Sequence, residues 1–458
     1  MHPTRMTPKW ILAAAFAALP AALAADPTPA EIMQQLQVLQ QQVQEQQKVI
    51  EALRSQASAA APAAATQEQV SALVKQEVKT AMDAKGGPTI SLGKGIDSLK
   101  LTGDLRLRYE YADVSGDPDS ASASRRGDSR VHDRFRHRAR LGGIWTNPAE
   151  NWEIGLGMEY GSGRGNSAND SWNKGSTWES GDAYLDYAYA RHTFRDSLEG
   201  LKLTLGQQPN PFLATFVMFD GDLRPTGLTL QYDKCSFFGT AGAYNLRSDT
   251  KITGSSDQST ADLVAAQVGI NLKSGKHFGK VALGLYVGDS ETSEYTFGAG
   301  NDDYSYEIGQ LYAEAGTTMG EVKGKLFGEY LTNAGVDDDF SQLSYRPRGG
   351  PGDSYDSDGN DTAWCLGTEF GWRKFKASYA YAHIEGDSVP RFFSDSDFGA
   401  GLPDGALNTQ GHVFSLSYAF TKNFEVQATM FLVKPLETDE GNDDMDVVQY
   451  QLDAKYKF

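Results

Sequence analysis

Hydrophobic and polar residues alternate along many short segments of this chain from residue 98 onward. In segment 98–111, one face carries Leu99, Leu101, Gly103, Leu105, Leu107, Tyr109 and Tyr111, and the other carries Lys100, Thr102, Asp104, Arg106, Arg108 and Glu110. A period of two predicts a β-strand with one apolar and one polar surface. We count sixteen such segments, near residues 98–111, 134–146, 151–161, 181–193, 200–208, 227–234, 236–246, 261–272, 277–288, 304–316, 320–332, 361–372, 373–385, 409–420, 423–433 and 446–458.

The connections between the predicted strands alternate in length. Those after even-numbered segments are short, such as NPAE (147–150) and TKN (421–423), whereas those after odd-numbered segments are mostly long. Tight turns at one end and long loops at the other are typical of outer-membrane barrels. A soluble β-sandwich is the alternative, but it would use Greek-key links and an unusually large single core. The pattern therefore predicts an all-β fold, a transmembrane antiparallel β-barrel of about 16 strands over residues 98–458.

The first 97 residues follow other patterns. Residues 1–25 combine basic residues with a short apolar run and a small-residue cleavage site, which predicts a secretory signal peptide rather than a membrane anchor. Residues 26–57 repeat apolar positions at heptad spacing, which predicts an α-helical coiled coil, although a helix packed on its own domain is the alternative. Its seam consists of Ile32, Leu36, Leu39, Val43, Ile50 and Leu53. Residues 58–97 predict an Ala/Pro linker and a second helix.

The strand number also predicts orientation and location. An even number of strands places both ends of a barrel on the same side of the membrane. Because the coiled-coil region is soluble, that side is expected to be the periplasm, and the long loops then face outside. We expect a multi-pass protein of the bacterial outer membrane, surrounded by lipid and lipopolysaccharide.

Six arginines form a candidate basic ladder on the first two strands. The stretch RFRHRARLG (134–142) carries four of them at alternate positions, so they share one face of a strand. A barrel arginine facing the middle of the bilayer costs about 2–4 kcal/mol, so this face should line the lumen. The predicted hairpin brings together Arg106, Arg108, Arg134, Arg136, Arg138 and Arg140, against the four acids Asp104, Glu110, Glu153 and Glu159. The ladder is interpreted either as a salt-bridged wall that stiffens the barrel or as a positive surface that selects ions.

The long connection after the fifth strand is a candidate constriction loop. The stretch PFLATFVMFDGDLRPTG (211–227) is too apolar to lie in water, so it should fold into the barrel or pack at a subunit interface. In the first case, two aspartates of the loop would face the arginine ladder. The candidate residues of this loop are Asn210, Pro211, Phe212, Asp220, Asp222 and Arg224.

The chain is acidic, with 42 Lys+Arg against 60 Asp+Glu and a formal net charge of −18. Four predicted outer loops, 289–303, 333–361, 386–406 and 433–446, hold 22 acids and 4 bases, a difference equal to the whole net charge. These loops are interpreted as solvated, with binding of divalent cations and lipopolysaccharide as the alternative. The acidic balance argues against nucleic acid as a partner.

Neither a cofactor nor an enzyme is predicted. The histidines are scattered, and no nucleophile lies beside a base in a recognisable motif. No metal site is predicted either. Cys235 falls in a predicted turn and Cys365 near the other end of a strand, so a disulfide between them is not expected. Aromatic residues such as Trp152, Trp372, Tyr187 and Tyr189 are interpreted as girdles at the membrane interfaces.

Three stretches give the chain a family resemblance. LTGDLRLRYEY (101–111), RFRHRARLG (134–142) and above all LGQQPNPFLATFVMFDGDLRPTGLTLQY (205–232) resemble the putative porins of Gram-negative bacteria, and more distantly the phosphate-selective porins. The strong motif covers fewer than 30 residues. The resemblance implies a trimeric outer-membrane channel and leaves the substrate open.

Two functions remain as expectations. The first is a porin that allows passive diffusion of small hydrophilic solutes or ions, with a weak preference for anions. The second is a structural protein, in which the coiled coil contacts peptidoglycan and the barrel is an anchor.

Overall fold

A computed structural model of the protein describes residues 98–115, 130–162, 166–173, 181–247, 261–290, 306–336, 360–402, 405–436 and 446–458. They belong to the second of two compact units of the chain, Pro88–Phe458. The predicted signal peptide, coiled coil, linker and second helix lie outside the described residues, as do most residues of the acidic segments 289–303, 333–361 and 433–446. Among the described residues, no helix is long and apolar enough to span a membrane.

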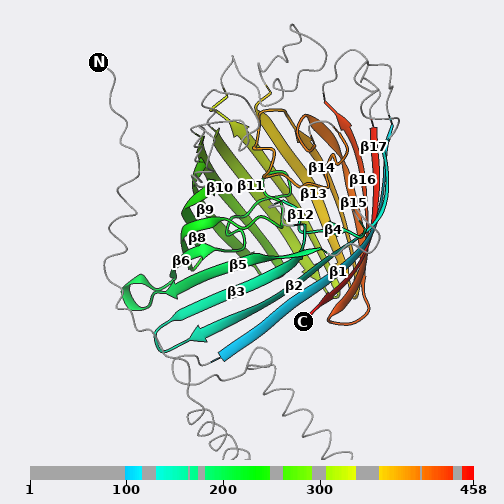
Figure 1. The fold of residues 1–458 in the computed structure, drawn as a ribbon. Helices are drawn as coiled ribbons and strands as arrows, with labels where there is room; N and C mark the ends of the chain where they lie inside the picture. Colours follow the sequence, from blue (N-terminus) through cyan, green and yellow to red (C-terminus); the bar gives the residue numbers. More distant parts are fainter. Residues whose placement is uncertain are drawn as a thin grey trace, which may run out of the picture. The chain divides into compact units, whose positions relative to one another are not determined.

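Sixteen long strands form a closed antiparallel barrel, which confirms the predicted fold class (Figure 1). They are β1 (Ser98–Ser115), β2 (Arg130–Asn147), β3 (Trp152–Gly161), β5 (Asp182–Thr193), β6 (Leu201–Gln207), β7 (Thr226–Lys234), β8 (Phe237–Arg247), β9 (Ala261–Ser274), β10 (His277–Ser290), β11 (Tyr306–Met319), β12 (Val322–Asn333), β13 (Thr362–Trp372), β14 (Phe375–Ile384), β15 (Thr409–Ala419), β16 (Phe424–Pro435) and β17 (Asp446–Lys457). A two-residue strand, β4 (Asp170–Ser171), pairs with β2 beyond the end of β3. Consecutive long strands are neighbours, and β1 closes the barrel by pairing with both β2 and β17.

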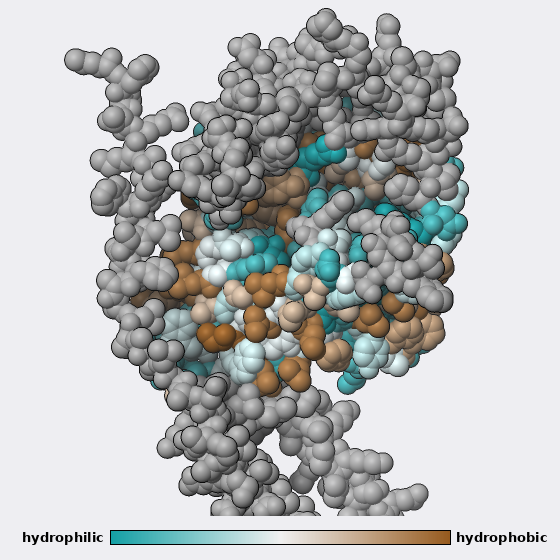
Figure 2. Space-filling view, in the orientation of Figure 1, coloured by the Kyte–Doolittle hydropathy of each residue, from teal (hydrophilic) through white to brown (hydrophobic). Residues whose placement is uncertain are grey.

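Strand alternation separates a lipid-facing surface from the interior. On β1 and β2, Leu101 and Leu141 are more than half exposed, whereas Arg108 and Glu110 are buried. An apolar outer band is what a barrel needs to contact lipid. Figure 2 shows many of the hydrophobic residues (brown) on the visible surface of the molecule.

Very short turns join the strands at one end of the barrel. The turns between β7 and β8, β9 and β10, β11 and β12, and β13 and β14 have two residues each, and the first has positive φ in every case. Such backbone matches the twist of the flanking strands and favours glycine, which is present as Gly275 and Gly320. Cys235 and Arg373 take the same conformation without being glycine. The predicted alternation of short and long connections is therefore confirmed.

The C-terminal residue completes the closure of the barrel. The backbone N–H of Phe458 donates to the carbonyl of Gly103 at 3.0 Å, and that of Gly103 donates back at 3.1 Å. The Phe458 ring lies so close to Gly103 that a Cβ added there would be 2.4 Å from it. The last residue therefore pairs with the first strand of the barrel.

Two tyrosines predicted for the membrane girdles lie inside the barrel instead. Tyr187 and Tyr189 of β5 cover Gly142, Gly155 and Gly157 on the inner face of β2 and β3. A Cβ at any of these three glycines would come within 2.4 Å of a tyrosine ring or hydroxyl. The girdle interpretation was wrong for both, because the glycines leave room for the rings on the inner face.

The hydrophobic core lies within the barrel and is built by two long connections that fold inward. We call residues 208–225, between β6 and β7, the first inner loop, and residues 385–402 and 405–408, between β14 and β15, the second inner loop. Their buried side chains pack against inward-facing residues of the strands in one cluster, which includes Phe212, Val217, Met218, Phe219, Val389, Phe393, Phe398, Leu402, Leu407, Tyr244, Tyr286, Ile308 and Leu331. The apolar stretch after the fifth strand is thus buried within its own chain.

The second inner loop corrects a prediction. Segment 386–406 was expected to be one of the solvated acidic outer loops, but Asp387, Val389 and Phe398 are fully buried. The acidic residues of this segment suggested exposure to solvent, whereas its apolar residues are buried inside the barrel.

Candidate functional site

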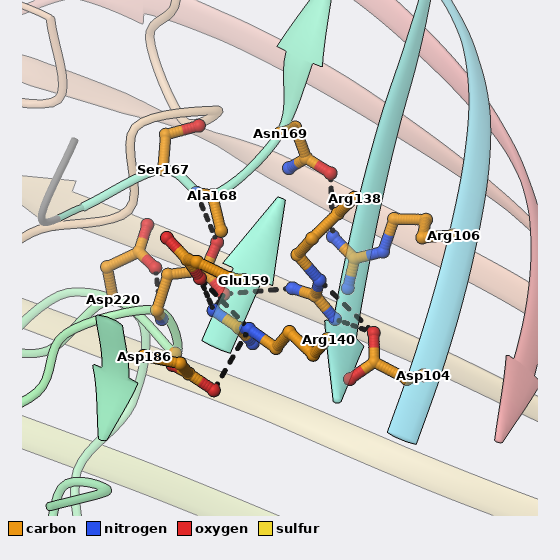
Figure 3. Close-up of polar contacts among 12 residues, drawn as sticks. Asp104, Arg106, Arg138, Arg140, Glu159, Ser167, Ala168, Asn169, Asp186 and Asp220 are labelled. Atoms are coloured by element: carbon orange, nitrogen blue, oxygen red, sulfur yellow. Dashed lines mark hydrogen bonds and ion pairs between the residues drawn. The ribbon is translucent and has the colours of Figure 1, made fainter. Parts of the chain in front are cut away.

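The six arginines of β1 and β2 form a continuous arginine wall on the inner face of the barrel. Figure 3 shows Arg106, Arg138 and Arg140 of this wall with nearby polar residues. The hairpin pairs Arg106 with Arg138 and Arg108 with Arg136. We use the name arginine wall for Arg106, Arg108, Arg134, Arg136, Arg138 and Arg140. Adjacent cations repel each other, so the wall requires counter-charges within contact distance.

The carboxylates that contact Arg108, Arg134 and Arg136 come from β1, β17 and the second inner loop. Arg108 forms a bidentate pair with Asp453 of β17, at 2.7 and 3.0 Å, and contacts Asp397 at 2.6 Å. Glu110 accepts from Arg134 at 2.5 Å and from Arg136 at 3.0 Å. These contacts fasten the second inner loop to the wall through Asp397.

The carboxylates that contact Arg138 and Arg140 come from β1, β3, β5 and the first inner loop. Arg138 contacts Asp104 and Asp222, each at 2.9 Å. Arg140 contacts Asp222 at 3.0 Å and Glu159 of β3 at 2.9 Å, with Asp186 of β5 at 3.4 Å. The single carboxylate of Asp222 therefore links both Arg138 and Arg140 to the first inner loop.

The expected positive surplus of the wall is absent from the described contacts. The hairpin was predicted to carry six arginines against four acids, but Glu153 pairs with Arg191 instead. Seven acids contact the wall, namely Asp104, Glu110, Glu159, Asp186, Asp222, Asp397 and Asp453. Arg224 of the first inner loop shares Asp186 at 2.8 Å, and Lys455 of β17 lies 3.8 Å from Asp453. The seven acids therefore contact six arginines and one lysine, and Arg106 has no partner among the described acids. The prediction failed because the additional acids come from segments that are distant in sequence.

Polar side chains of the opposite wall hold the backbone of the first inner loop. Gln267 of β9 accepts from the Leu213 N–H at 2.9 Å and donates to the Leu213 carbonyl at 2.7 Å. Glu329 of β12 accepts from both the backbone N–H (2.8 Å) and the hydroxyl of Thr215, and Gln310 of β11 donates to Glu329 at 2.5 Å. The loop is thus anchored to both walls of the barrel.

The candidate residues of the first inner loop have different roles. Asn210 accepts from the Phe212 N–H at 3.0 Å and shapes the turn around Pro211. Phe212 packs edge-on against Tyr286. Asp222 and Arg224 contact charged residues, as described above. Asp220 contacts no arginine among the described ion pairs and joins the second inner loop instead.

The two inner loops are hydrogen-bonded to each other. The Asp220 N–H donates to the Phe393 carbonyl at 2.6 Å, and the Asp220 carboxylate accepts from the Ser396 N–H at 3.2 Å. The Asp395 N–H donates to the Phe216 carbonyl at 3.0 Å. Sequence reasoning missed this partner loop, although aromatic residues at 392, 393 and 398 within an acidic segment were a usable signal.

Four aspartates at this junction have shifted pKa values. Burial alone would raise the pKa of Asp222, but the guanidinium groups of Arg138 and Arg140 lower it to about 2. Likewise, burial is outweighed at Asp397, where Arg108 and Arg136 hold the pKa well below its usual range. Burial raises the pKa of Asp220 to about 7, and burial together with Asp220 raises that of Asp395 well above its usual range.

A cavity of about 420 Å³ lies beside the first inner loop. Its lining includes the charged residues Glu159, Asp186 and Arg224 and the aromatic residues Phe219, Tyr244 and Phe392. Within the part of the chain that the structure describes, no three His, Cys, Asp or Glu side chains are placed to hold a metal ion. Cys235 is exposed and Cys365 buried, and both are free thiols.

Comparison with known proteins gives one family and a set of barrel structures. The model of a family described as putative porin matches residues 30–295 and 304–456. Similar solved structures include OprB of Pseudomonas putida at high pH (14% identity, TM-score 0.48, covering 83% of this chain and 96% of that one). DcaP, an outer-membrane channel of Acinetobacter baumannii, has 16% identity and a TM-score of 0.45, and covers 81% and 99% of the two chains. OmpF of Salmonella typhi, in complex with daunomycin, has 11% identity and a TM-score of 0.46, and covers 81% and 100%. No curated protein sequence matches the chain.

Proposed function

Because this chain belongs to the putative porin family, we propose that it allows passive diffusion of small hydrophilic solutes or ions across the outer membrane, with a weak preference for anions. The protein is an outer-membrane β-barrel channel and not an enzyme. The observation that carries the proposal is the attachment of two inner loops to a charged wall inside a closed barrel.

Fixed charges in a narrow, low-dielectric passage select solutes more strongly than the same charges in water. Both inner loops bring carboxylates to guanidinium groups, so a passing solute meets alternating charges of both signs. The preference for anions is expected to be weak because seven acids contact the arginine wall and offset its positive charge, although Arg106 contacts none of them.

Planar-bilayer recordings of the purified full chain test this function. We expect discrete conductance steps. Across a KCl gradient, we expect a reversal potential displaced slightly from zero toward the equilibrium potential of chloride. A barrel that inserts and gives no conductance would contradict the proposal. A reversal potential displaced toward the equilibrium potential of potassium would contradict only the anion preference.

We also propose that the chain assembles as a homotrimer, with its apolar outer face in contact with lipid and lipopolysaccharide. Leu101, Leu141 and Leu283 are each more than half exposed on this face. The mass of the complex in detergent tests the proposal, and a monomer that conducts would contradict it.

A further inference from the structure

Arg106 differs from the other five arginines of the wall. It forms no ion pair with any described acid, whereas each of the others contacts at least one carboxylate. Its Nε is buried and has no protein acceptor among the described residues. Its one hydrogen bond to a residue that the structure describes runs from Nη1 to the side-chain oxygen of Asn169 and is long at 3.4 Å. The side chain is partly exposed, so it reaches the interior of the barrel.

The acids near Arg106 are already occupied by other cations. Asp453 uses both carboxylate oxygens for Arg108, at 2.7 and 3.0 Å. Asp104 accepts from Arg138 through Nε and Nη2, at 3.2 and 2.9 Å. Asp222 is shared by Arg138 and Arg140. Each of these acids could turn to Arg106 only by giving up a contact with another buried guanidinium.

Two further cations flank Arg106 in the same row of the sheet. Across β1, the strand register pairs Arg106 with Arg138 on one side and with Lys455 of β17 on the other. Lys455 donates to Gln427 at 2.6 Å and lies 3.8 Å from Asp453, so its ammonium group also keeps donors available. The row Lys455–Arg106–Arg138 therefore places three cations side by side, and the central one contacts no described acid.

We propose that Arg106 and Lys455 bind the anionic group of a passing solute, either a carboxylate or a phosphate-type oxyanion. The guanidinium supplies planar donors that match two oxygens of such a group, and the ammonium supplies a third donor from the neighbouring strand. Arg138 adds positive field, but each of its three nitrogens already donates to Asp104 or Asp222. This site rests on the proposed channel function and assigns to it a class of solute.

Block of chloride current in planar bilayers tests the site, with inorganic phosphate and acetate as separate probes. In the wild-type channel we expect both anions to reduce the chloride current in a saturable way. Arg106→Gln should raise the half-blocking concentration about tenfold, the loss expected for one charge-assisted hydrogen bond. Block by phosphate but not acetate would restrict the site to phosphate-type oxyanions, and the reverse would restrict it to carboxylates.

Lys280→Gln is the matched control, because Lys280 is an inward-facing cation of β10, whose partner Glu314 lies on the neighbouring strand β11. Its half-blocking concentrations should equal those of the wild type. Arg106→Lys serves as a second variant if Arg106→Gln does not fold, and it should weaken block less than Gln because it keeps the charge. A conducting channel in which neither Arg106 variant changes the block by phosphate or acetate would overturn the site. A wild-type barrel that inserts without conducting would overturn the channel function instead.

Discussion

Asp222 Oδ1 lies 2.9 Å from Nη1 of Arg138, and this contact ties the first inner loop to the arginine wall. The other oxygen of Asp222 accepts from the Ala168 N–H at 2.9 Å, so the residue also holds the segment before β4. One loop residue thereby fixes the relative positions of three parts of the interior.

We expect Asp222→Asn to loosen the first inner loop. The change leaves Arg138 and Arg140 with less counter-charge in a buried setting, which should cost about 1–3 kcal/mol of stability. The loss of one negative charge should also strengthen the anion preference. Thermal unfolding in detergent and the reversal potential in bilayers measure the two effects. Glu369→Ala, which removes an inward-facing carboxylate exposed beside Lys325, is a control expected to change stability little.

The anchoring by Asp222 should depend on pH at the acid end. Its pKa is lowered from 3.8 to about 2, so ionised Asp222 stabilises the loop fully above about pH 4 and loses this effect as the pH falls through 2. Single-channel recordings between pH 5 and pH 2 should therefore show noisier currents toward low pH. An equal change in Asp222→Asn would show that another group is responsible.

The junction of the two inner loops should respond to pH in the opposite direction. The pKa of Asp220 is raised from 3.8 to about 7 by burial, with Asp222 and Asp397 adding negative charge nearby and Asp395 beside it. Because the packed state retains the proton, the junction is most stable below about pH 4 and weakens as the pH rises through 7. Protection of the Ser396 amide against hydrogen exchange, corrected for intrinsic rates, should fall between pH 5 and pH 8.

Asp220→Asn should reduce this dependence on pH because the amide does not ionise, and Asp395 is then the remaining group at the junction with a raised pKa. Asp233→Asn, at an exposed position at the end of β7, is the matched control and should retain the wild-type profile. Identical profiles for all three proteins would show that Asp220 does not control the junction.

Glu329→Ala should release the first inner loop from the opposite wall. The Thr215 N–H and the Gln310 amide would lose their shared acceptor, which costs about 1–3 kcal/mol for a buried donor left unpaired. A displaced loop should enlarge the passage and raise single-channel conductance. Unchanged conductance together with unchanged unfolding temperature would mean that the loop is held without this contact.

Deletion of Phe458 should weaken the closure of the barrel. The deletion removes two backbone hydrogen bonds to Gly103 and the ring that covers this glycine. We expect a lower unfolding temperature and slower folding into detergent micelles. Phe420→Ala, in an exposed turn, is the control, and equal effects of the two changes would argue against a specific role for the C-terminal residue.

Much of the fold could be predicted because strand alternation is a local property. The alternation on β1 and β2 predicted which face holds the arginines, and the short distance between these strands in sequence indicated that they pair as a hairpin. The apolar composition of the first inner loop likewise indicated that it must be buried. In contrast, the second inner loop was predicted to be an outer loop because it is rich in aspartates. Its aromatic residues are buried, and Asp397 pairs with an arginine inside the barrel.

The identity of those partners depends on closure of the barrel. Asp453 is 345 residues away from Arg108 in the chain, and only the pairing of β17 with β1 places the two side chains 2.7 Å apart. A local pattern reports which way a side chain points from its strand, but a charge is neutralised by whatever lies near it in space. The sequence was therefore sufficient for the barrel and the inward direction of the arginines, whereas their pairing, and the one arginine left without an acid, follow from the three-dimensional arrangement.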